Sequence, residues 1–196
     1  EWIHRSDRRP EFPVEVLLTP IQLEGQQLMM TTWRDISARK QAESHHHLLS
    51  SALRSAANAF VITDRWGTIE WVNPAFTALT GYTLAEALGR NPGDLLRSGE
   101  HDAVFFKNLW DTILAGQTWQ GETINRRKDG TLYTEFQTIT PVRAGQDGIS
   151  HFVAIKEDVT ARKQTEARLR EQAEVIDKSP VAIIITDLAH RGTYCN

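Results

Sequence analysis

Hydrophobic and polar positions alternate in short runs near the start of the chain. Apolar residues occupy every second position from Phe12 to Leu18, and a second strand candidate, from Gln27 to Trp33, follows a turn at Gly25. This pattern predicts a β-hairpin. Because an isolated hairpin is at best marginally stable in water, we expect residues 1–37 to be the C-terminal end of a preceding domain.

The stretch from 59 to 157 predicts two strands, then several helices, then three strands. The predicted strands cover 59–63, 68–72, 119–127, 131–141 and 149–157, and the predicted helices cover 75–80, 83–88 and 102–115. Asn73 and Pro74 favour a helix start, whereas residues 91–93 predict a loop. Asp-Gly pairs at 129–130 and 147–148 favour hairpins. An antiparallel sheet with helices on one face is an α+β domain.

Two stretches without Gly or Pro, 38–57 and 160–178, predict linker helices. Ser37 and Thr160 are candidate helix caps, and we expect the first helix to break near Ser50. In the second helix Leu169, Ala173 and Ile176 recur at spacings of four and three, as in the seam of a coiled coil. This seam predicts a parallel homodimer.

A charged sequence segment occurs twice, and its two copies indicate the domain boundaries. Residues 34–43 read RDISARKQAE and residues 157–166 read EDVTARKQTE, so that Asp35 and Asp158 lie 123 residues apart. Residues 59–64 and 182–187 match at the same spacing. We therefore predict the end of one domain (1–37), a linker helix (38–57), a complete domain (58–158), a linker or coiled-coil helix (159–179) and the first hairpin of a third domain (180–196).

Composition narrows the classes of function. The hydrophobic fraction of 40% and the charged fraction of 24% are ordinary for a soluble domain. A net charge of −3 leaves no basic surplus for nucleic-acid binding. The chain has no apolar run of the ~20 residues that span a membrane, so we expect no membrane contact in this segment. Cys195 is the single cysteine, which excludes an internal disulfide and favours a cytoplasmic setting.

No catalytic or metal site emerges from the sequence. His45, His46 and His47 are consecutive, so they spread around a helix and cannot all face one metal ion. Glu135 and Asp158 are at strand positions without a paired histidine or nucleophile. Whether the parent protein is an enzyme stays open.

A series of short motifs runs through the predicted complete domain. They are VITD at 61–64, WVNPAF at 71–76, TGY at 80–82, EALGRN at 86–91, WQGE at 119–122, NRRKDG at 125–130 and DVT at 158–160. In this order and at these spacings they resemble the PAS family of sensory domains. The resemblance implies a five-stranded antiparallel sheet that encloses a small pocket against short helices. It also implies signalling, usually in bacterial histidine kinases, cyclic-di-GMP enzymes or transcriptional regulators.

Within that family the chain is most similar to flavin-binding redox sensors. The resemblance implies that Trp110 lies against the flavin ring and that Asn125 hydrogen-bonds its polar edge. The candidate cofactor-binding residues are Trp110, Asn125, Asn91, Val61 and Phe76, with FAD as the possible cofactor. Two positions depart from the pattern, because Val61 stands where such sensors can place a serine and Pro92 where they can place a glutamate. The alternative that the pocket is empty or holds another small molecule is therefore not excluded by the sequence.

The residues of this chain match PAS domains that bind other cofactors less well. Light-sensing PAS domains place a cysteine directly after the asparagine, where this chain has Pro92. Haem needs an axial ligand, usually a histidine, and we expect His101 to be exposed at the start of its helix.

We predict a sensory module of a larger signalling protein, with neighbouring PAS and output domains in the same chain. Its pocket detects a redox state or a small ligand, and the helix after Asp158 relays the change. The alternative is a ligand-free PAS spacer that supports dimerisation between another sensor and an output domain.

Overall fold

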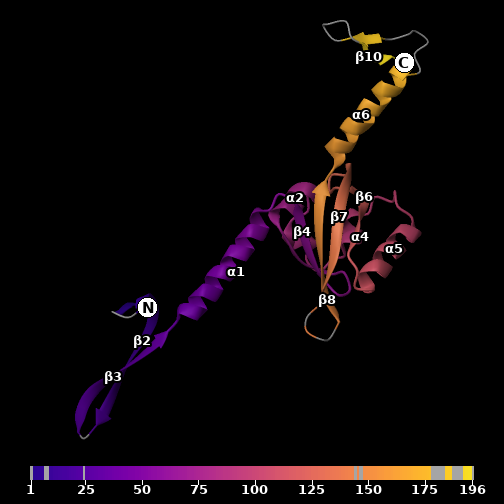
Figure 1. Cartoon of the computed structure of the whole chain (residues 1–196). Helices are drawn as coiled ribbons and strands as arrows, with labels where there is room; N and C mark the ends of the chain where they lie inside the picture. The colour runs from indigo at the N-terminus through magenta and orange to yellow at the C-terminus, as the bar shows by residue number, and fades with distance from the viewer. Residues whose placement is uncertain are drawn as a thin grey trace. The chain divides into compact units, whose positions relative to one another are not determined.

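The computed structural model describes residues 2–6, 9–23, 25–143, 145, 148–177, 184–186 and 192–195 (Figure 1). The chain divides into two compact units, Glu1–Arg54 and Ser55–Asn196. Among the described residues, no helix is both long enough and apolar enough to cross a membrane.

The first unit holds an antiparallel sheet of order β1-β2-β3, formed by β1 (Trp2–Ser6), β2 (Arg9–Leu23) and β3 (Gln26–Asp35). The predicted hairpin corresponds to β2 and β3, whereas β1 was not predicted as a strand. Helix α1 (Ser37–Ser55) follows.

The prediction that this helix breaks near Ser50 is wrong, because α1 is continuous through that position. The neighbouring Leu and Ala residues are good helix formers, and serine in a helix interior costs only a fraction of a kcal/mol, up to about 0.7 kcal/mol, relative to alanine. The cap also differs from the prediction, since the Asp35 carboxylate accepts the Ser37 N–H at 2.8 Å.

The second unit contains the predicted five-stranded antiparallel sheet. Its strands are β4 (Ala59–Asp64), β5 (Ile69–Val72), β6 (Trp119–Arg126), β7 (Leu132–Arg143) and β8 (Ile149–Asp158), in the order β5-β4-β8-β7-β6. The first and last segments of the domain thus meet at the centre of the sheet, where Val61 pairs with Ala154.

Short helices pack on one face of this sheet. They are α2 (Pro74–Thr80), α3 (Leu84–Ala87), α4 (Pro92–Leu96) and α5 (Ala103–Leu114). Asn73 caps α2 by accepting the Phe76 N–H, as predicted. The loop predicted at 91–93 is wrong, because Asn91 caps α4 and Pro92 takes its first position, where the missing N–H has no cost.

Two apolar clusters fill the space between helices and sheet. One surrounds Phe76, which is fully buried between β4, β5 and the first helices. The other lies beneath α5 and includes Leu109, Trp119 and Phe152. A cavity between them is lined by members of both clusters, among them Val61 and Phe152, and by polar side chains of the sheet.

Helix α6 (Thr160–Asp177) begins directly after β8. Its side chains from Gln164 to Glu174 are exposed, so the domain does not bury them. Beyond it, β9 (Ile184–Thr186) and β10 (Gly192–Cys195) pair antiparallel. The Ile176 side chain, Pro180 and the flanks of the predicted third-domain hairpin, 182–183 and 187, lie outside the described residues.

Candidate functional site

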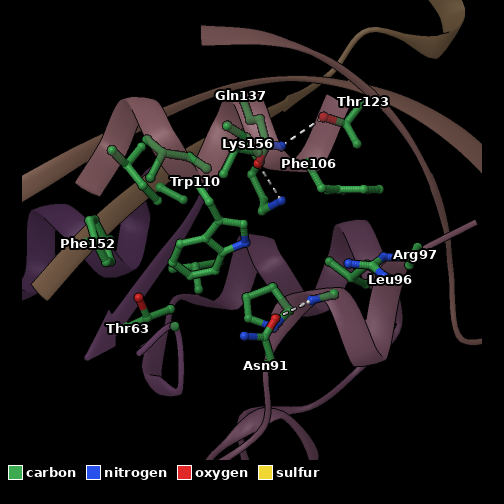
Figure 2. A pocket seen from close by; sticks show the side chains of 18 of the residues that line it. Thr63, Asn91, Leu96, Arg97, Phe106, Trp110, Thr123, Gln137, Phe152 and Lys156 are labelled. Atoms are coloured by element: carbon green, nitrogen blue, oxygen red, sulfur yellow. Dashed lines mark hydrogen bonds between the residues drawn. The ribbon is translucent and has the colours of Figure 1, made fainter. Parts of the chain in front are cut away.

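A cavity of about 110 Å³ lies between the inner face of the five-stranded sheet and helices α4 and α5 (Figure 2). Aromatic and aliphatic side chains form most of its helical side, and polar side chains from β6, β7 and β8 form part of its sheet side. The lining residues used below are Val61, Gly67, Asn91, Arg97, Phe106, Trp110, Thr123, Asn125, Gln137, Phe152 and Lys156.

The Trp110 indole forms the flat wall of the cavity and is held on two sides. Its ring meets that of Phe152 edge to face, with centroids 6.0 Å apart. On another side it closely approaches the backbone of Gly67, where an added Cβ would lie 2.8 Å from Trp110 Cη2 and 2.9 Å from Asn91 Nδ2. Gly67 also has φ +84°, so glycine is required there for both conformation and space.

The polar wall is a buried hydrogen-bonded cluster of Thr123, Asn125, Glu135, Gln137 and Lys156. The Lys156 ammonium donates to Glu135 Oε1 and to Gln137 Oε1, the latter at 3.0 Å. Asn125 Nδ2 donates to Glu135 Oε1 at 2.9 Å, and Gln137 Nε2 donates to Thr123 Oγ1 at 2.8 Å. Each charge is thus paired and hydrogen-bonded, as a buried ion pair requires.

Strand register brings this cluster together. Alternate residues of a strand face the same side of a sheet, and Gln137 pairs with Lys156 while Asn125 pairs with Tyr133. Glu135 faces inward between Tyr133 and Gln137 on β7. The sequence interpretation missed the roles of Glu135 and Lys156, although the alternation along 133–139 was a signal that Glu135 faces inward.

A chain of contacts leads from this cluster to the start of α6. The Tyr133 hydroxyl donates to Glu135 Oε2 at 3.1 Å, and the Arg127 guanidinium lies over the Tyr133 ring, 4.4 Å from its centroid. Arg127 Nη2 then pairs with Asp158 Oδ2 at 2.6 Å, and Asp158 Oδ1 accepts the Thr160 N–H at 2.9 Å. The cavity wall and the first residue of α6 therefore belong to one contiguous network.

The first turn of α6 is fastened to the sheet. The N–H of the buried Val159 donates to the Thr134 carbonyl at 2.9 Å, and the Thr134 N–H donates to Thr160 Oγ1 at 2.9 Å. Thr160 is therefore not the cap that we predicted, because its hydroxyl binds β7 and Asp158 accepts its N–H. Lys163 adds an ion pair to Glu122 on β6 at 2.8 Å.

Two acid–base groups along the network have shifted pKa values. Partial burial acts to raise the pKa of the Asp158 carboxyl, but hydrogen bonds from Thr160 and the Arg127 guanidinium outweigh it and lower the pKa below its usual range. Burial, followed by the nearby Glu135 charge, raises the pKa of Tyr133 far above its usual value. Tyr133 therefore stays a neutral hydrogen-bond donor at every physiological pH.

Four of the five predicted cofactor-binding residues line one cavity. They are Trp110, Asn125, Asn91 and Val61. Phe76 instead lies in the core cluster with no exposed surface and is not among the lining residues. Cofactor binding by these residues stays a prediction.

The histidine at the start of α5 differs from the expectation. His101 is half-buried rather than exposed, because its Nε2 accepts the Ile124 N–H at 2.8 Å and its ring stacks on Phe105 at a centroid distance of 4.1 Å. It thus has a structural role between α5 and β6. Within the described part of the chain, no three His, Cys, Asp or Glu side chains gather as metal ligands would.

Comparison with known proteins places residues 57–161 in the family described as PAS domain. The chain is 34% identical over 149 residues to the nitrogen fixation regulatory protein of Klebsiella oxytoca, which covers 74% of this chain and 30% of that protein. It is 33% identical over 99 residues to the aerotaxis receptor of Escherichia coli, which covers 50% of this chain and 19% of the receptor. The chain thus spans less than a third of these relatives.

Solved structures agree on the fold. An RNA-binding light-oxygen-voltage receptor superposes with a TM-score of 0.62 at 25% identity, which covers 85% of this chain and 44% of that one. A light-oxygen-voltage domain studied with a flavin analogue superposes with a TM-score of 0.54 at 26% identity, which covers 67% of this chain and 98% of that one.

Proposed function

Because the chain belongs to the PAS domain family, we propose that it is a sensory module of a larger signalling protein. The cavity binds a small planar ligand, and α6 carries the response to the next domain. One observation carries this proposal: the contacts that join Lys156 in the cavity wall to Thr160 at the start of α6.

A flavin is the first candidate ligand, and the side chains of the cavity fit it in kind. Trp110 offers a flat apolar surface, and the buried wall offers both a donor at Lys156 and an acceptor at Asn125. A volume of about 110 Å³ holds roughly one small aromatic ring, since an engineered cavity of about 150 Å³ takes up benzene. A flavin therefore requires the Trp110 indole to turn aside. Once bound, a flavin would supply reversible electron uptake.

The relay follows from the ion pair in the wall. A ligand atom that accepts the remaining N–H of the Lys156 ammonium draws Lys156 toward the cavity and weakens its contact with Glu135. Glu135 is also the acceptor for Tyr133, and the Tyr133 ring supports Arg127, which holds Asp158. A shift of Glu135 therefore reaches the group that caps the first turn of α6.

An absorption spectrum of the purified chain tests the ligand. A flavin gives visible bands, and protein denaturation followed by chromatography distinguishes FAD from FMN. A colourless protein that also shows no bound small molecule by mass spectrometry after denaturation would overturn the sensory proposal.

The alternative function is a ligand-free spacer that supports dimerisation. Val61 and Pro92 favour it, since both line the cavity and neither side chain offers a polar group to a ligand. A spacer predicts a stable dimer in a protein that binds no small molecule, and that the polar wall can be changed without loss of signalling.

We further propose that the first unit is the end of a preceding PAS domain. Asp35 pairs with Val14 as Asp158 pairs with Glu135, and Ile36 donates to Pro13 as Val159 donates to Thr134. The proposed architecture is a tandem of PAS domains that leads to an output domain, such as a histidine kinase or a cyclic-di-GMP enzyme. The α6 seam, Leu169, Ala173 and Ile176, is the proposed homodimer contact.

A further inference from the structure

Three amide side chains in the cavity wall have fixed orientations. Asn91 Oδ1 accepts the Gly93 N–H at 2.9 Å, and a backbone N–H can only donate. Gln137 Oε1 accepts from the Lys156 ammonium, which also can only donate. Asn125 Nδ2 donates to the Glu135 carboxylate, which accepts when ionised. The groups that remain for a ligand are therefore defined by their partners.

Most of these remaining groups are hydrogen-bond donors. Asn91 keeps both N–H groups of Nδ2, and Lys156 keeps one of its three ammonium N–H groups after its bonds to Glu135 and Gln137. Asn91 and Lys156 both line the cavity, and Asn91 Nδ2 donates to no other described side chain or backbone group (Figure 2). Asn125 Oδ1 is the contrasting group, a carbonyl acceptor on the same wall.

Net charge does not determine which ligands the polar wall of the cavity binds. The positive charge of Lys156 is balanced by Glu135, which contacts it directly. The guanidinium of Arg97 lies over the Phe106 ring, 4.3 Å from its centroid, and it too can only donate. The wall therefore distinguishes ligands mainly by whether their ring atoms accept or donate hydrogen bonds.

We propose that the cavity selects the oxidised form of a planar heterocycle, whose ring nitrogens and carbonyls accept hydrogen bonds and which carries one ring N–H for Asn125. Reduction of such a ring adds hydrogen to ring nitrogens, so that acceptors become donors and face the N–H groups of Lys156 or Asn91. A buried donor without an acceptor weakens binding by roughly tenfold or more. This inference rests on the proposed function and specifies which ligand form that cavity takes.

Calorimetric titration tests the inference with riboflavin as the probe. The full chain is titrated with oxidised riboflavin, and under anaerobic conditions with riboflavin reduced by dithionite, in mildly acidic buffer that keeps the reduced ring neutral. We expect the oxidised form to bind at least about tenfold more tightly, which corresponds to a two-electron potential about 30 mV lower for the bound ring. Equal binding of the two forms would overturn this inference and leave the proposed function standing, whereas binding of neither would overturn this inference together with the flavin as the ligand.

The variant Asn91→Ser identifies the donor responsible. Serine also caps a helix well, so α4 keeps its start while the fixed N–H donors disappear. The preference for oxidised riboflavin should fall at least about threefold. The matched control is Asn58→Ser, an exposed position outside the cavity lining, which should keep the preference of the natural chain. An unchanged preference in Asn91→Ser would refute the assignment.

Discussion

Lys156 and Glu135 form an ion pair that is almost completely removed from water, with 4% and 0% of their side chains exposed. Such a pair gains little net stability over apolar packing, because removing two charges from water offsets their attraction. The pair is nonetheless fully hydrogen-bonded through Asn125, Tyr133 and Gln137. Its position beside the cavity supports the proposal that it serves ligand recognition more than stability.

Removal of one member of the pair should be costly. Lys156→Met leaves the Glu135 charge buried without a cation, and we expect the free energy of unfolding to fall by about 3–5 kcal/mol. The double variant Lys156→Met with Glu135→Gln removes the charge but keeps an acceptor for Asn125, and should recover more than half of that loss. Urea unfolding measures both, and equal losses would show that the charge is not the cause.

Gly67 should resist substitution for two separable reasons. Gly67→Ala places a non-glycine residue at positive φ, at a cost of about 1–2 kcal/mol, and its Cβ also displaces Trp110 and Asn91. The matched control is Gly130→Ala, where φ is +90° but nothing lies within 4 Å of the new Cβ. Thermal unfolding should show a larger loss for Gly67→Ala, and only that variant should change ligand affinity.

Sequence patterns located part of the site and missed the rest for a physical reason. Trp110, Asn91 and Asn125 belong to motifs that the family resemblance identifies, and all three line the cavity. Lys156 and Glu135 lie 21 residues apart on different strands. Their contact depends on the register between β7 and β8, which alternation along a single strand does not reveal.

At the scale of elements, the junction between β8 and α6 is held by several hydrogen bonds. Asp158 accepts a hydrogen bond from the first residue of the helix, and the Val159 side chain is buried. The Thr160 hydroxyl accepts a hydrogen bond from β7. The same arrangement of Asp35 and Ser37 starts α1. A rigid junction converts a displacement of the strand into a displacement of the helix.

The junction should weaken in acid. The pKa of Asp158 is lower in the folded chain than its ordinary value of 3.8, so its stabilising effect is complete above that value and is lost as the pH falls through the folded pKa. Asp158→Asn cannot titrate and loses the ion pair to Arg127, which for a partly exposed pair costs about 0.5–1 kcal/mol at neutral pH. Unfolding free energies measured from neutral to acidic pH should therefore fall less steeply in the variant. Parallel curves for the two proteins would contradict this role.

Predictions of strands and helices were correct where neighbouring residues determine where an element begins, and wrong where pairing or length determines it. Asn73 and Pro74 mark the start of α2 in both sequence and structure. The sequence around Asn91 predicts a loop because the helix that begins there has only five residues, which are too few to show the hydrophobic periodicity of a helix. Strand β1 escaped prediction because its five residues lack clear alternation, and it is held by pairing with β2.

At the scale of the whole molecule, α6 has exposed side chains that its own domain leaves uncovered. Leu169 is 60% exposed on a helix in which most residues are charged or polar. An exposed leucine in a seam with Ala173 is the feature on which the proposed dimer rests.

A charge in the seam should separate the protomers. Leu169→Asp places a carboxylate at the proposed helix–helix contact, and we expect the dimer dissociation constant to rise at least about tenfold, which corresponds to 1.4 kcal/mol. Ala167→Asp is the matched control, since this exposed residue lies on the other side of α6. Sedimentation velocity across a concentration series checks both, and an unchanged dimer in Leu169→Asp would count against the seam.

The two sheets of this chain lead into their helices through the same kind of junction, but the strand pairs beside the junction differ. Where the second unit pairs Gln137 with Lys156 and Glu135 with Asp158, the first pairs Val16 with Trp33 and Val14 with Asp35. The junction is thus alike in both units, whereas the paired side chains beside it differ in chemistry. Such a separation would make the domain modular. Mutation of a few positions on a strand could change what the domain binds, while the junction that connects the sheet to the next helix stays the same.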